Sequence, residues 1–307
     1  MADPSGILLI NKPQGVTSHR VVNSLRHLLP AEKAGHTGTL DPDATGLLIV
    51  LTGRAVKAAE YMVLDTKSYS AVLRLGVVTD TQDITGQIIS SSETLPSEER
   101  VLSVCQSFTG KIKQLPPMYS ALKVGGRKLV DLARRGVTVE REEREVEITR
   151  LQAKRISPSE YSLEVDCSSG TYIRTLCHDI GAALGCGGAM QSLCRTKCGK
   201  YSLENAVTIE EIEKMAPNER ASLLIPAETL FEALPRVTLD GFYLKLCRSG
   251  CEIYQAKIKT PYPTGQRVRL CDKDGFFALG EVREYEAGSA IKPIKLFRTE
   301  DKDERNT

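Results

Sequence analysis

Residues 35–46 read GHTGTLDPDATG, and the rest of the chain is best understood as a support for this stretch. Three glycines and a proline fall within twelve residues, so the backbone must turn here and cannot continue as a helix. Asp41 directly precedes Pro42, which favours an extended or turn conformation for the aspartate. A carboxylate placed in this way can point away from its own backbone and take part in chemistry.

Two simpler interpretations of the stretch remain open from its residues alone. Asp41 can close an ordinary Asx-turn. The spacing of the acidic and small residues also resembles the start of a calcium loop, but the twelfth position is Thr52 where such a loop needs a bidentate glutamate. Apolar residues fill positions 47–51, which also argues against calcium.

The whole string resembles the catalytic motif of the TruB family, the tRNA pseudouridine-55 synthases. In this family the aspartate of the motif is the essential catalytic residue, so the resemblance implies that Asp41 is catalytic. It also implies that His36 contacts the RNA loop, where it would fill or order the space left by a flipped base. An acid/base role for His36 is the alternative, because an imidazole titrates near neutral pH.

Length and composition describe an ordinary globular chain. It has 307 residues, of which 41% are apolar and 26% charged, enough for one large domain with a small one or for two medium domains. No apolar run approaches the roughly 20 residues of a membrane span, and residues 7–10 are too short for the core of a signal peptide. We therefore expect a cytoplasmic protein.

Charge and cysteine content limit the partners further. The 41 basic and 39 acidic residues give a net charge of +2, so a nucleic-acid surface must be a local patch. Nine scattered cysteines favour reduced thiols over a disulfide framework. A zinc site is conceivable at the four cysteines Cys177, Cys186, Cys194 and Cys198, although small buried thiols are the simpler interpretation.

The N-terminal segment predicts a strand, a turn and an amphipathic helix. Residues 6–10 favour a strand, and Thr17 or Ser18 can cap a helix with apolar residues on one face. The string NKPQGVTS at 11–18 resembles the opening motif of the same family, in which the lysine and proline shape the wall of the active site. Lys12 is thus expected in the connecting turn as a substrate-binding residue, with a solvated lysine as the alternative.

Two further strands are predicted around a polar loop. Residues 47–51 form a continuous apolar run typical of a central strand, and residues 54–63 favour a short helix. Residues 67–75 (KSYSAVLRL) alternate, which places Tyr69 on the inner face. The resemblance implies that Tyr69 stacks on the target base and takes part in acid/base chemistry. The spacing alone is equally compatible with a tyrosine that packs in the core. The loop GVVTDTQDITG at 76–86 matches a family pattern with a turn-holding role.

A basic segment lies at about 115–150. It is punctuated by paired prolines and glycines and resembles the RNA-binding insertion of the family, including the string PPMYSALK. A cationic hairpin of this kind lets a nearly neutral protein grip phosphates, although a solvated charged face has the same composition. The expected contacts to the RNA backbone are Lys123, Arg127, Lys128, Arg134 and Arg135. Val130 stands where members commonly have tyrosine.

Strands are predicted at 137–156 and 161–167, followed by a helix that begins near Gly170. Arg174 falls in the first turn of this helix, where the helix dipole disfavours a cation and a carboxylate partner is expected. The string GTYIRT resembles the family motif whose arginine pairs with the catalytic aspartate. We therefore predict an Arg174–Asp41 ion pair that keeps Asp41 ionised and oriented. Tyr172 is expected to line the pocket, with core packing as its alternative.

The segment at 186–202 resembles a family strand that ends in L-R-R-T-x-x-G. Leu193 and Arg195 are retained, and Leu193 is expected to pack against the target base. Cys194 replaces the first arginine of that pattern, and Ala189 stands where a histidine is frequent. These two departures predict fewer RNA contacts nearby.

From about residue 236 the composition changes to short alternating runs with turns, including a hairpin signal at Asp274-Gly275. The fold class expected is α+β, a mixed and largely antiparallel sheet flanked by helices, followed by a small β-barrel similar to the PUA module of bacterial members. The expected domains are 1–235 for the catalytic part and 236–298 for the PUA-like part, with a disordered tail at 299–307.

The resemblance implies an enzyme that isomerises uridine at position 55, in the T-loop of tRNA, to pseudouridine. Such a reaction only rearranges atoms, so no metal, redox cofactor or ATP is expected. The implied partner is tRNA, and the protein is expected to be a monomer with no obligatory protein partner. Three other classes remain open, namely a non-catalytic tRNA-binding or folding factor, an RNA glycosylase, and a thiol or zinc protein.

Overall fold

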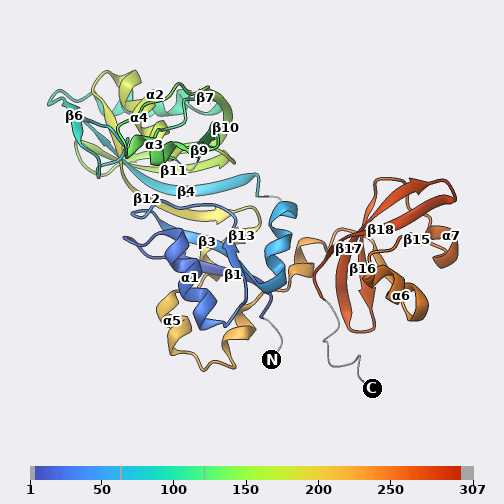
Figure 1. The fold of residues 1–307 in the computed structure, drawn as a ribbon. Coiled ribbons are helices and arrows are strands. Elements are labelled where there is room, and N and C mark those ends of the chain that lie inside the picture. Colours follow the sequence, from blue (N-terminus) through green and yellow to red (C-terminus); the bar gives the residue numbers. More distant parts are fainter. Residues whose placement is uncertain (1–3, 63, 121, 299–307) are drawn as a thin grey trace.

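The computed structural model describes residues 4–62, 64–120 and 122–298, and it consists of a large sheet-based body and a smaller C-terminal sheet (Figure 1). The order along the main path of the large sheet is β1-β3-β12-β4-β11-β10-β7, with β2 paired to β3 and β13 paired to β12. Its strands are β1 (Gly6–Lys12), β2 (Ala34–His36), β3 (Thr45–Thr52), β4 (Thr66–Leu75), β7 (Gly110–Gln114), β10 (Arg144–Arg155), β11 (Glu160–Ser168), β12 (Gly188–Cys198) and β13 (Tyr201–Ser202).

The pairing confirms a mixed, largely antiparallel sheet. Among the described residues, β3 and β12 form its parallel pair, through Cys194 opposite Thr45 and Arg195 opposite Gly46. The other neighbours on the path pair antiparallel. The parallel junction brings the strand that follows the 35–46 stretch against residues almost 150 positions later in the chain.

The apolar run of β3 is buried on both faces, which explains why it does not alternate. One face of β1 and β3 packs against helix α1 (Ser18–Leu28) and α5 (Ile209–Lys214). The other face packs against the 3₁₀ segment η1 (Gly53–Tyr61) and the chain near residues 198–206. Continuous hydrophobicity is the expected pattern for a strand covered on both sides.

The predicted helix caps are present. The side chain of Thr17 accepts a hydrogen bond from Arg20 N at the start of α1, and that of Ser97 accepts one from Arg100 N at the start of α2 (Glu98–Ser107). Thr208 and Glu211 form a reciprocal capping box on α5. Each cap satisfies a backbone N–H that the first turn of a helix leaves without a partner.

Helix α4 (Ile173–Leu184) covers the half of the sheet built from β4, β10, β11 and β12, together with α2. The expected strand at 137–156 is wrong at its start, because β10 begins at Arg144. Its partner β7 is only five residues long and its pairing ends with Arg144 opposite Gln114. The residues before 144 therefore have no strand against which to form a ladder.

The basic segment contains a small hairpin, β8 (Lys123–Val124) and β9 (Arg127–Lys128), followed by helix α3 (Leu129–Ala133). Gly125 and Gly126 form its turn with φ of 57° and 79°. A two-residue turn with both φ values positive matches the twist of a hairpin, and glycine adopts it without strain. A second hairpin, β5 (Val77–Thr79) and β6 (Ile88–Ser91), frames the polar loop at 79–87.

The C-terminal part is a curled five-stranded sheet, consistent with a PUA-like module. Its order is β14-β16-β17-β18-β15, and α6 (Gly241–Arg248) and α7 (Gln255–Ile258) lie beside it (Figure 1). The strands are β14 (Arg236–Thr238), β15 (Ile253–Tyr254), β16 (Arg267–Asp272), β17 (Gly275–Tyr285) and β18 (Gly288–Leu296). The predicted hairpin is present, with Asp272 opposite Gly275.

Short 3₁₀ segments connect the two parts, at η2 (Leu203–Asn205), η3 (Arg220–Leu223) and η4 (Ala227–Leu230). Phe231 follows η4 and packs against the C-terminal part, where its ring centroid lies 5.6 Å from the ring centroids of both Phe276 and Phe297. The exact domain division stays a prediction, and the expected tail at 299–307 lies outside the described residues. Within the described ranges, no helix has the length and apolar character needed to span a membrane.

Candidate active site

The loop that carries Asp41 runs between β2 and β3 and is tied to the start of α1. The hydroxyl of Ser18 donates to Leu40 O and accepts from Leu40 N, both at 2.9 Å, and all of these atoms are buried. Gly15 N donates to Pro42 O, also at 2.9 Å. Asp41 is therefore held from both sides by backbone contacts that do not use its carboxylate.

Lys12 braces the same loop from behind. It is the last residue of β1 and is completely buried, and its Nζ donates to Pro13 O, Val16 O and Pro42 O at 2.7–2.9 Å. Burial lowers the pKa of Lys12 to about 8, against the opposing effect of Asp43 and Asp41. The expected place in the connecting turn is wrong, because Lys12 still belongs to β1, and its side chain has no accessible surface in this structure. Its contact with Pro42 O supports the loop next to Asp41, and its role in substrate binding stays a prediction.

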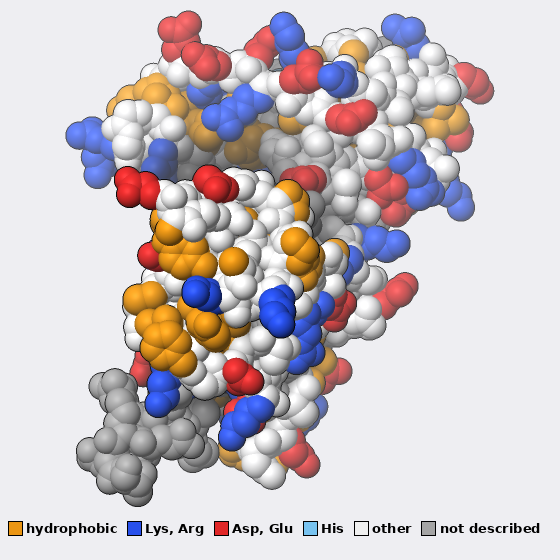
Figure 2. Space-filling view, turned by 90° about the vertical axis from the view of Figure 1, so that its right-hand side faces the viewer, with side chains coloured by type: hydrophobic (Ala, Val, Ile, Leu, Met, Phe, Trp, Pro, Cys, Tyr) orange, Lys and Arg blue, Asp and Glu red, His pale blue; other side chains and the backbone are white. Residues whose placement is uncertain are grey.

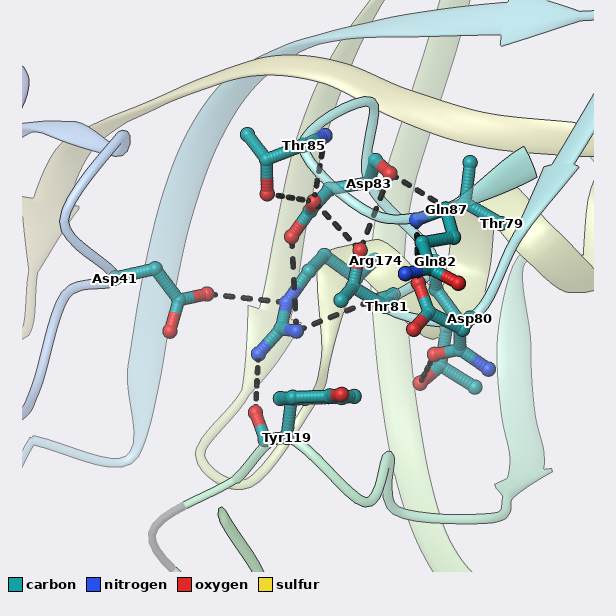
Figure 3. A network of polar contacts seen from close by, with 11 residues as sticks. Asp41, Thr79, Asp80, Thr81, Gln82, Asp83, Thr85, Gln87, Tyr119 and Arg174 are labelled. Atoms are coloured by element: carbon teal, nitrogen blue, oxygen red, sulfur yellow. Dashed lines mark hydrogen bonds and ion pairs between the residues drawn. The ribbon is translucent and has the colours of Figure 1, made fainter. Parts of the chain in front are cut away.

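Arg174 forms the predicted ion pair with Asp41. Its Nε lies 3.0 Å from Asp41 Oδ2, and its side chain is only 7% exposed (Figure 3). Nη1 also lies 3.7 Å from Asp83 Oδ2 and donates to Thr81 O at 3.1 Å, while Nη2 donates to Tyr119 O at 2.7 Å. The guanidinium is consequently fixed in one orientation and presents Nε to Asp41.

Asp83 is a partner of Arg174, whereas the sequence predicted for its loop a turn-holding role and contact with the RNA-facing rim. Its Oδ1 accepts from Thr81 Oγ1 at 2.8 Å, from Thr85 N at 3.0 Å and from Thr85 Oγ1 at 2.6 Å (Figure 3). Asp80 fixes the other side of the loop by accepting from Gln87 N at 2.8 Å. The turn-holding expectation is confirmed, and it leaves the second oxygen of Asp83 directed at Arg174.

The surroundings of Asp41 act on its pKa in opposite directions. Desolvation raises the pKa above the ordinary value of 3.8, Arg174 and Lys12 lower it, and the like charges of Asp83 and Asp43 raise it. The net direction is upward. The side chain is 41% exposed, but the exposed part faces the cavities described next, where protein atoms still replace much of the bulk water.

Two adjoining cavities meet at Asp41, Arg174 and Leu193. The first has a volume of about 270 Å³ and contains Tyr69, Tyr172 and Leu193 on its wall. The second has a volume of about 290 Å³ and reaches Val130 and Arg134 of the basic segment. The catalytic and substrate-binding residues expected from sequence are therefore gathered here, with the exceptions of Lys12 and His36.

Tyr69 lies on the inner face of β4 and is 7% exposed. Burial raises the pKa of its hydroxyl to about 12, although the neighbouring guanidinium of Arg195 opposes this rise. The hydroxyl is therefore protonated at neutral pH and can donate a hydrogen bond, whereas a phenolate would need a much higher pH. An aromatic ring on a cavity wall also offers a face on which a base can stack.

Tyr172 is the N-cap residue of α4, and buried Gln114 fixes its backbone. Gln114 Oε1 accepts from Tyr172 N at 3.0 Å, and Gln114 Nε2 donates to Tyr172 O at 3.2 Å. Leu193 is held in β12, where its carbonyl accepts from Thr45 Oγ1 at 3.3 Å. Leu193 stands on a strand and Tyr172 directly precedes a helix, with its backbone bonded to Gln114, so both positions are better fixed than those of an open loop.

His36 lies in β2 and is not on the wall of either cavity. Burial, followed by the charges of Arg195 and His19, lowers the pKa of His36 below 6.5. The imidazole is thus mostly neutral at pH 7. Its expected contact with the RNA loop stays a prediction.

Two cations of the first cavity, Lys67 and Arg195, were not assigned a role from sequence. Lys67 precedes Tyr69 by two residues in β4, so strand alternation could have placed both on the same face. Burial lowers the pKa of Lys67. Arg195 is 2% exposed and donates to the carbonyls of Leu47 and Gly38. With Arg174, these residues give the cavity more cationic than anionic groups.

The basic residues at 123–135 occupy two kinds of position. Arg134 lines the second cavity, although it is exposed. Lys123, Arg127, Lys128 and Arg135 are exposed. On the face of the molecule in Figure 2, basic and acidic side chains are interspersed and form no broad field of one sign. The exposed basic side chains of the hairpin thus form a local cationic patch on a protein whose net charge is only +2.

The nine cysteines are free thiols, and seven of them are buried. Burial raises the pKa of several, among them Cys105 and Cys167, each to about 11. No group of three or more histidine, cysteine or acidic side chains is arranged to hold a metal ion within residues 4–62, 64–120 and 122–298. The cysteines of the described chain thus contribute mainly to packing.

Comparison with known proteins agrees with this geometry. Residues 26–173 match the N-terminal domain of the TruB family pseudouridylate synthases, and residues 174–232 match the tRNA pseudouridylate synthase B C-terminal domain. A tRNA pseudouridine synthase B from Alkaliphilus oremlandii is 41% identical over 96% of this chain and 98% of its own length. The chain belongs to the TruB family of pseudouridine synthases. It is accordingly an isomerase.

Other members of the TruB family and a solved structure give the same result. The tRNA pseudouridine synthase B of Syntrophotalea carbinolica is 46% identical over 74% of this chain and 75% of its own. A crystal structure of a Cbf5-Nop10-Gar1 complex contains a chain that is 26% identical, with a TM-score of 0.66 over 95% of this chain and 85% of that one. The similarity extends through the C-terminal sheet.

The departures from the TruB pattern lie close to the site. Val130 lines the second cavity, Cys194 is half-buried at the parallel junction, and Ala189 is completely buried in β12. An alanine at 189 leaves no side chain that could reach RNA. The effect of Cys194 on RNA contacts stays a prediction.

Proposed function

We propose that this enzyme isomerises the uridine at position 55, in the T-loop of tRNA, to pseudouridine, with Asp41 as the catalytic residue. The observation that carries the proposal is the Asp41 carboxylate, held 3.0 Å from Arg174 on the wall of a cavity shared with Tyr69 and Leu193. The names of the relatives, tRNA pseudouridine synthase B, support tRNA as the substrate.

The reaction breaks the bond between N1 of uracil and C1′ of ribose and forms a bond between C5 and C1′ after the base has rotated. The proton on C5 is lost to solvent, and N1 gains one. Asp41 would act as a nucleophile at C1′ or as the base that removes a ribose proton, and its geometry is compatible with both. Either role requires the ionised carboxylate, which Arg174 favours.

The uridine must leave the stacked loop before Asp41 can reach it. Flipping a base costs a few kcal/mol, which stacking and phosphate contacts must offset. In the proposed complex Tyr69 stacks on the flipped base, while Tyr172 and Leu193 close the cavity around it. The excess of cationic over anionic groups in the cavity suits the phosphodiester that enters with the base.

The exposed hairpin at 123–128 is proposed to grip the tRNA backbone, with Arg134 and Arg135 continuing the contact. These cations neutralise phosphates without reading sequence. Because the reaction only rearranges atoms within one nucleotide, it needs no redox cofactor or ATP. By analogy with the TruB family, we propose that the enzyme acts as a monomer without an obligatory protein partner.

The test is to follow tritium release from unmodified tRNA labelled at C5 of uridine, together with free uracil. We expect tritium release without free uracil. Asp41→Asn should abolish release while tRNA binding stays within a few-fold, whereas Asp43→Asn, a neighbouring carboxylate on the same loop, should retain turnover.

The alternatives give different results in the same assay. Free uracil would identify a glycosylase, and binding without release would identify a tRNA-binding or folding factor. Turnover by Asp41→Asn close to that of the unmodified sequence would overturn the assignment of Asp41.

A further inference from the structure

Arg195 lies where strand β12 pairs with both β3 and β4. In β12 it pairs with Gly46 of β3 in the parallel direction and with Tyr69 of β4 in the antiparallel direction. The approach to β3 is very close, because a Cβ added to Gly46 would lie 2.4 Å from Arg195 O. The backbone of Arg195 thus joins the end of the Asp41 loop to the strand of Tyr69.

The side chain of Arg195 closes the Asp41 loop. Its Nε donates to Leu47 O at 2.8 Å, and its Nη2 donates to Gly38 O at 3.1 Å. Gly38 precedes Asp41 by three residues and Leu47 follows it by six. A single planar guanidinium therefore fixes the separation of the two ends of the loop, with a fork geometry that a lysine could not reproduce.

The Arg195 side chain also lies near Tyr69, because both residues line the first cavity and the charge of Arg195 opposes the rise that burial causes in the pKa of Tyr69. Arg195 and Tyr69 are also direct cross-strand neighbours in the register of β12 and β4. The Tyr69 ring is thereby fixed relative to the Asp41 loop through one residue. Neither Tyr69 nor the loop needs a direct contact with the other for this to hold.

Arg195 differs from Arg174 in its partners. In the part of the chain that the structure describes, no carboxylate lies within 4.0 Å of the Arg195 guanidinium, although the side chain is 2% exposed. Burial of a cation without a counter-ion is costly. The carbonyls of Leu47 and Gly38 offset part of this cost, so the stability of the buried Arg195 depends on their positions.

We propose that Arg195 is a positioning residue, which sets the distance and angle between the Asp41 loop and the Tyr69 ring so that a base held by Tyr69 meets the Asp41 carboxylate. This inference rests on the proposed function. Its consequence is kinetic, because misplacement of reacting groups by about 1 Å can reduce a rate by about 100-fold while binding is largely kept.

The test compares Arg195→Lys with Arg220→Lys in the full chain. Arg220 is a matched control, because it also binds backbone carbonyls, those of Ile212, Met215 and Leu28, but lies outside both cavities. We expect Arg195→Lys to lower the single-turnover rate of tritium release by about 100-fold, with the tRNA Kd changed by less than about threefold. Arg220→Lys should lower Tm and leave the rate of the folded enzyme unchanged.

Two further measurements separate positioning from other roles. Because Arg195 acts through Tyr69, the rate effect of Arg195→Lys should be smaller in a Tyr69→Phe background, as in a double-mutant cycle. Amide hydrogen exchange at residues 38–47 should be faster in Arg195→Lys and unchanged in Arg220→Lys. Amide exchange does not depend on activity, so it tests the contacts of Arg195 with the Asp41 loop even if the unmodified sequence releases no tritium. A lack of tritium release would overturn the proposed function but not these contacts.

Three outcomes would overturn the inference. One is an Arg195→Lys rate equal to that of the unmodified sequence. Another is a loss of tRNA affinity as large as the loss of rate, which would make Arg195 a direct phosphate contact. The third is a combination of two results: the rate effects of Arg195→Lys and Tyr69→Phe are fully additive, and amide hydrogen exchange at residues 38–47 is unchanged in Arg195→Lys.

Discussion

The cavity and the basic hairpin both carry positive charge, but they carry it in different physical settings. In the cavity, Arg174 and Arg195 are 6% and 2% exposed and are held by short, directed contacts. On the hairpin, Lys123, Arg127 and Lys128 are exposed to solvent. In the cavity, function should therefore depend on the exact placement of each cation. On the hairpin it should depend on the total positive charge, because each exposed cation is replaceable and is screened by salt.

Among variants that contrast the cavity with the hairpin, the largest effect is expected for Arg174→Met, which leaves Asp41 and Asp83 without the cation between them. Turnover should fall by about 100-fold, which corresponds to ~3 kcal/mol. This is the lower end of the free-energy cost of removing one partner of a buried ion pair, because Asp41 is partly exposed. Single-turnover tritium release measures this effect.

A matched control is Arg248→Met in the C-terminal sheet, where Arg248 lies 2.6 Å from buried Asp272. This variant also breaks a buried pair, so its Tm should fall while turnover of the folded protein is kept. Equal loss of turnover in both variants would mean that the Arg174 effect is only one of stability.

An intermediate effect is expected when Lys123, Arg127 and Lys128 are replaced together by alanine. Each phosphate contact contributes about 0.7 to 0.9 to the slope of log affinity against log salt. The slope for tRNA binding should therefore fall by about 2 to 3, with little change in the rate at saturating enzyme. Binding titrations between low and physiological salt measure it.

The control for the hairpin uses the opposite charge on the same segment. Glu140, Glu142 and Glu143 are also exposed, and their replacement by alanine should strengthen binding slightly without lowering the salt slope. If the lysine and arginine variant bound tRNA with an unchanged slope, the hairpin would not contact phosphates.

The smallest effect is expected in the pH dependence. Turnover requires ionised Asp41, so it should rise as the pH increases through the pKa of this group, which lies above 3.8. Asp83 raises that pKa because it carries a like charge. Asp83→Asn removes the charge and should move the acidic limb of the turnover profile to lower pH, by less than about one unit.

This shift is measured by single-turnover rates between about pH 4 and 7, the range in which a raised carboxyl pKa titrates. Asp80→Asn is the control, because Asp80 lies on the same loop but binds Gln87 N and not Arg174. A limb that moved to higher pH in Asp83→Asn would show that Asp83 acts mainly by orienting Arg174.

Much of the local structure followed from sequence because local forces decide it. Thr17, Ser97 and Thr208 cap helices, Gly125-Gly126 turns a hairpin, and the alternation of 67–75 buries one face of β4. The resemblance to the TruB family added the pairing of Asp41 with Arg174, which local patterns could only suggest through a cation at a helix N-terminus.

The sequence by itself determined the turned loop at 35–46, the apolar central strand and the residues that we propose carry the chemistry. Only the tertiary structure decided that Lys12 is buried behind the loop, that Asp83 shares Arg174, and that Arg195 spans the loop and Tyr69. The reason is that β12 pairs with β3 and β4 across more than a hundred residues of chain. Such a register depends on packing of the whole sheet, and no short segment contains the information.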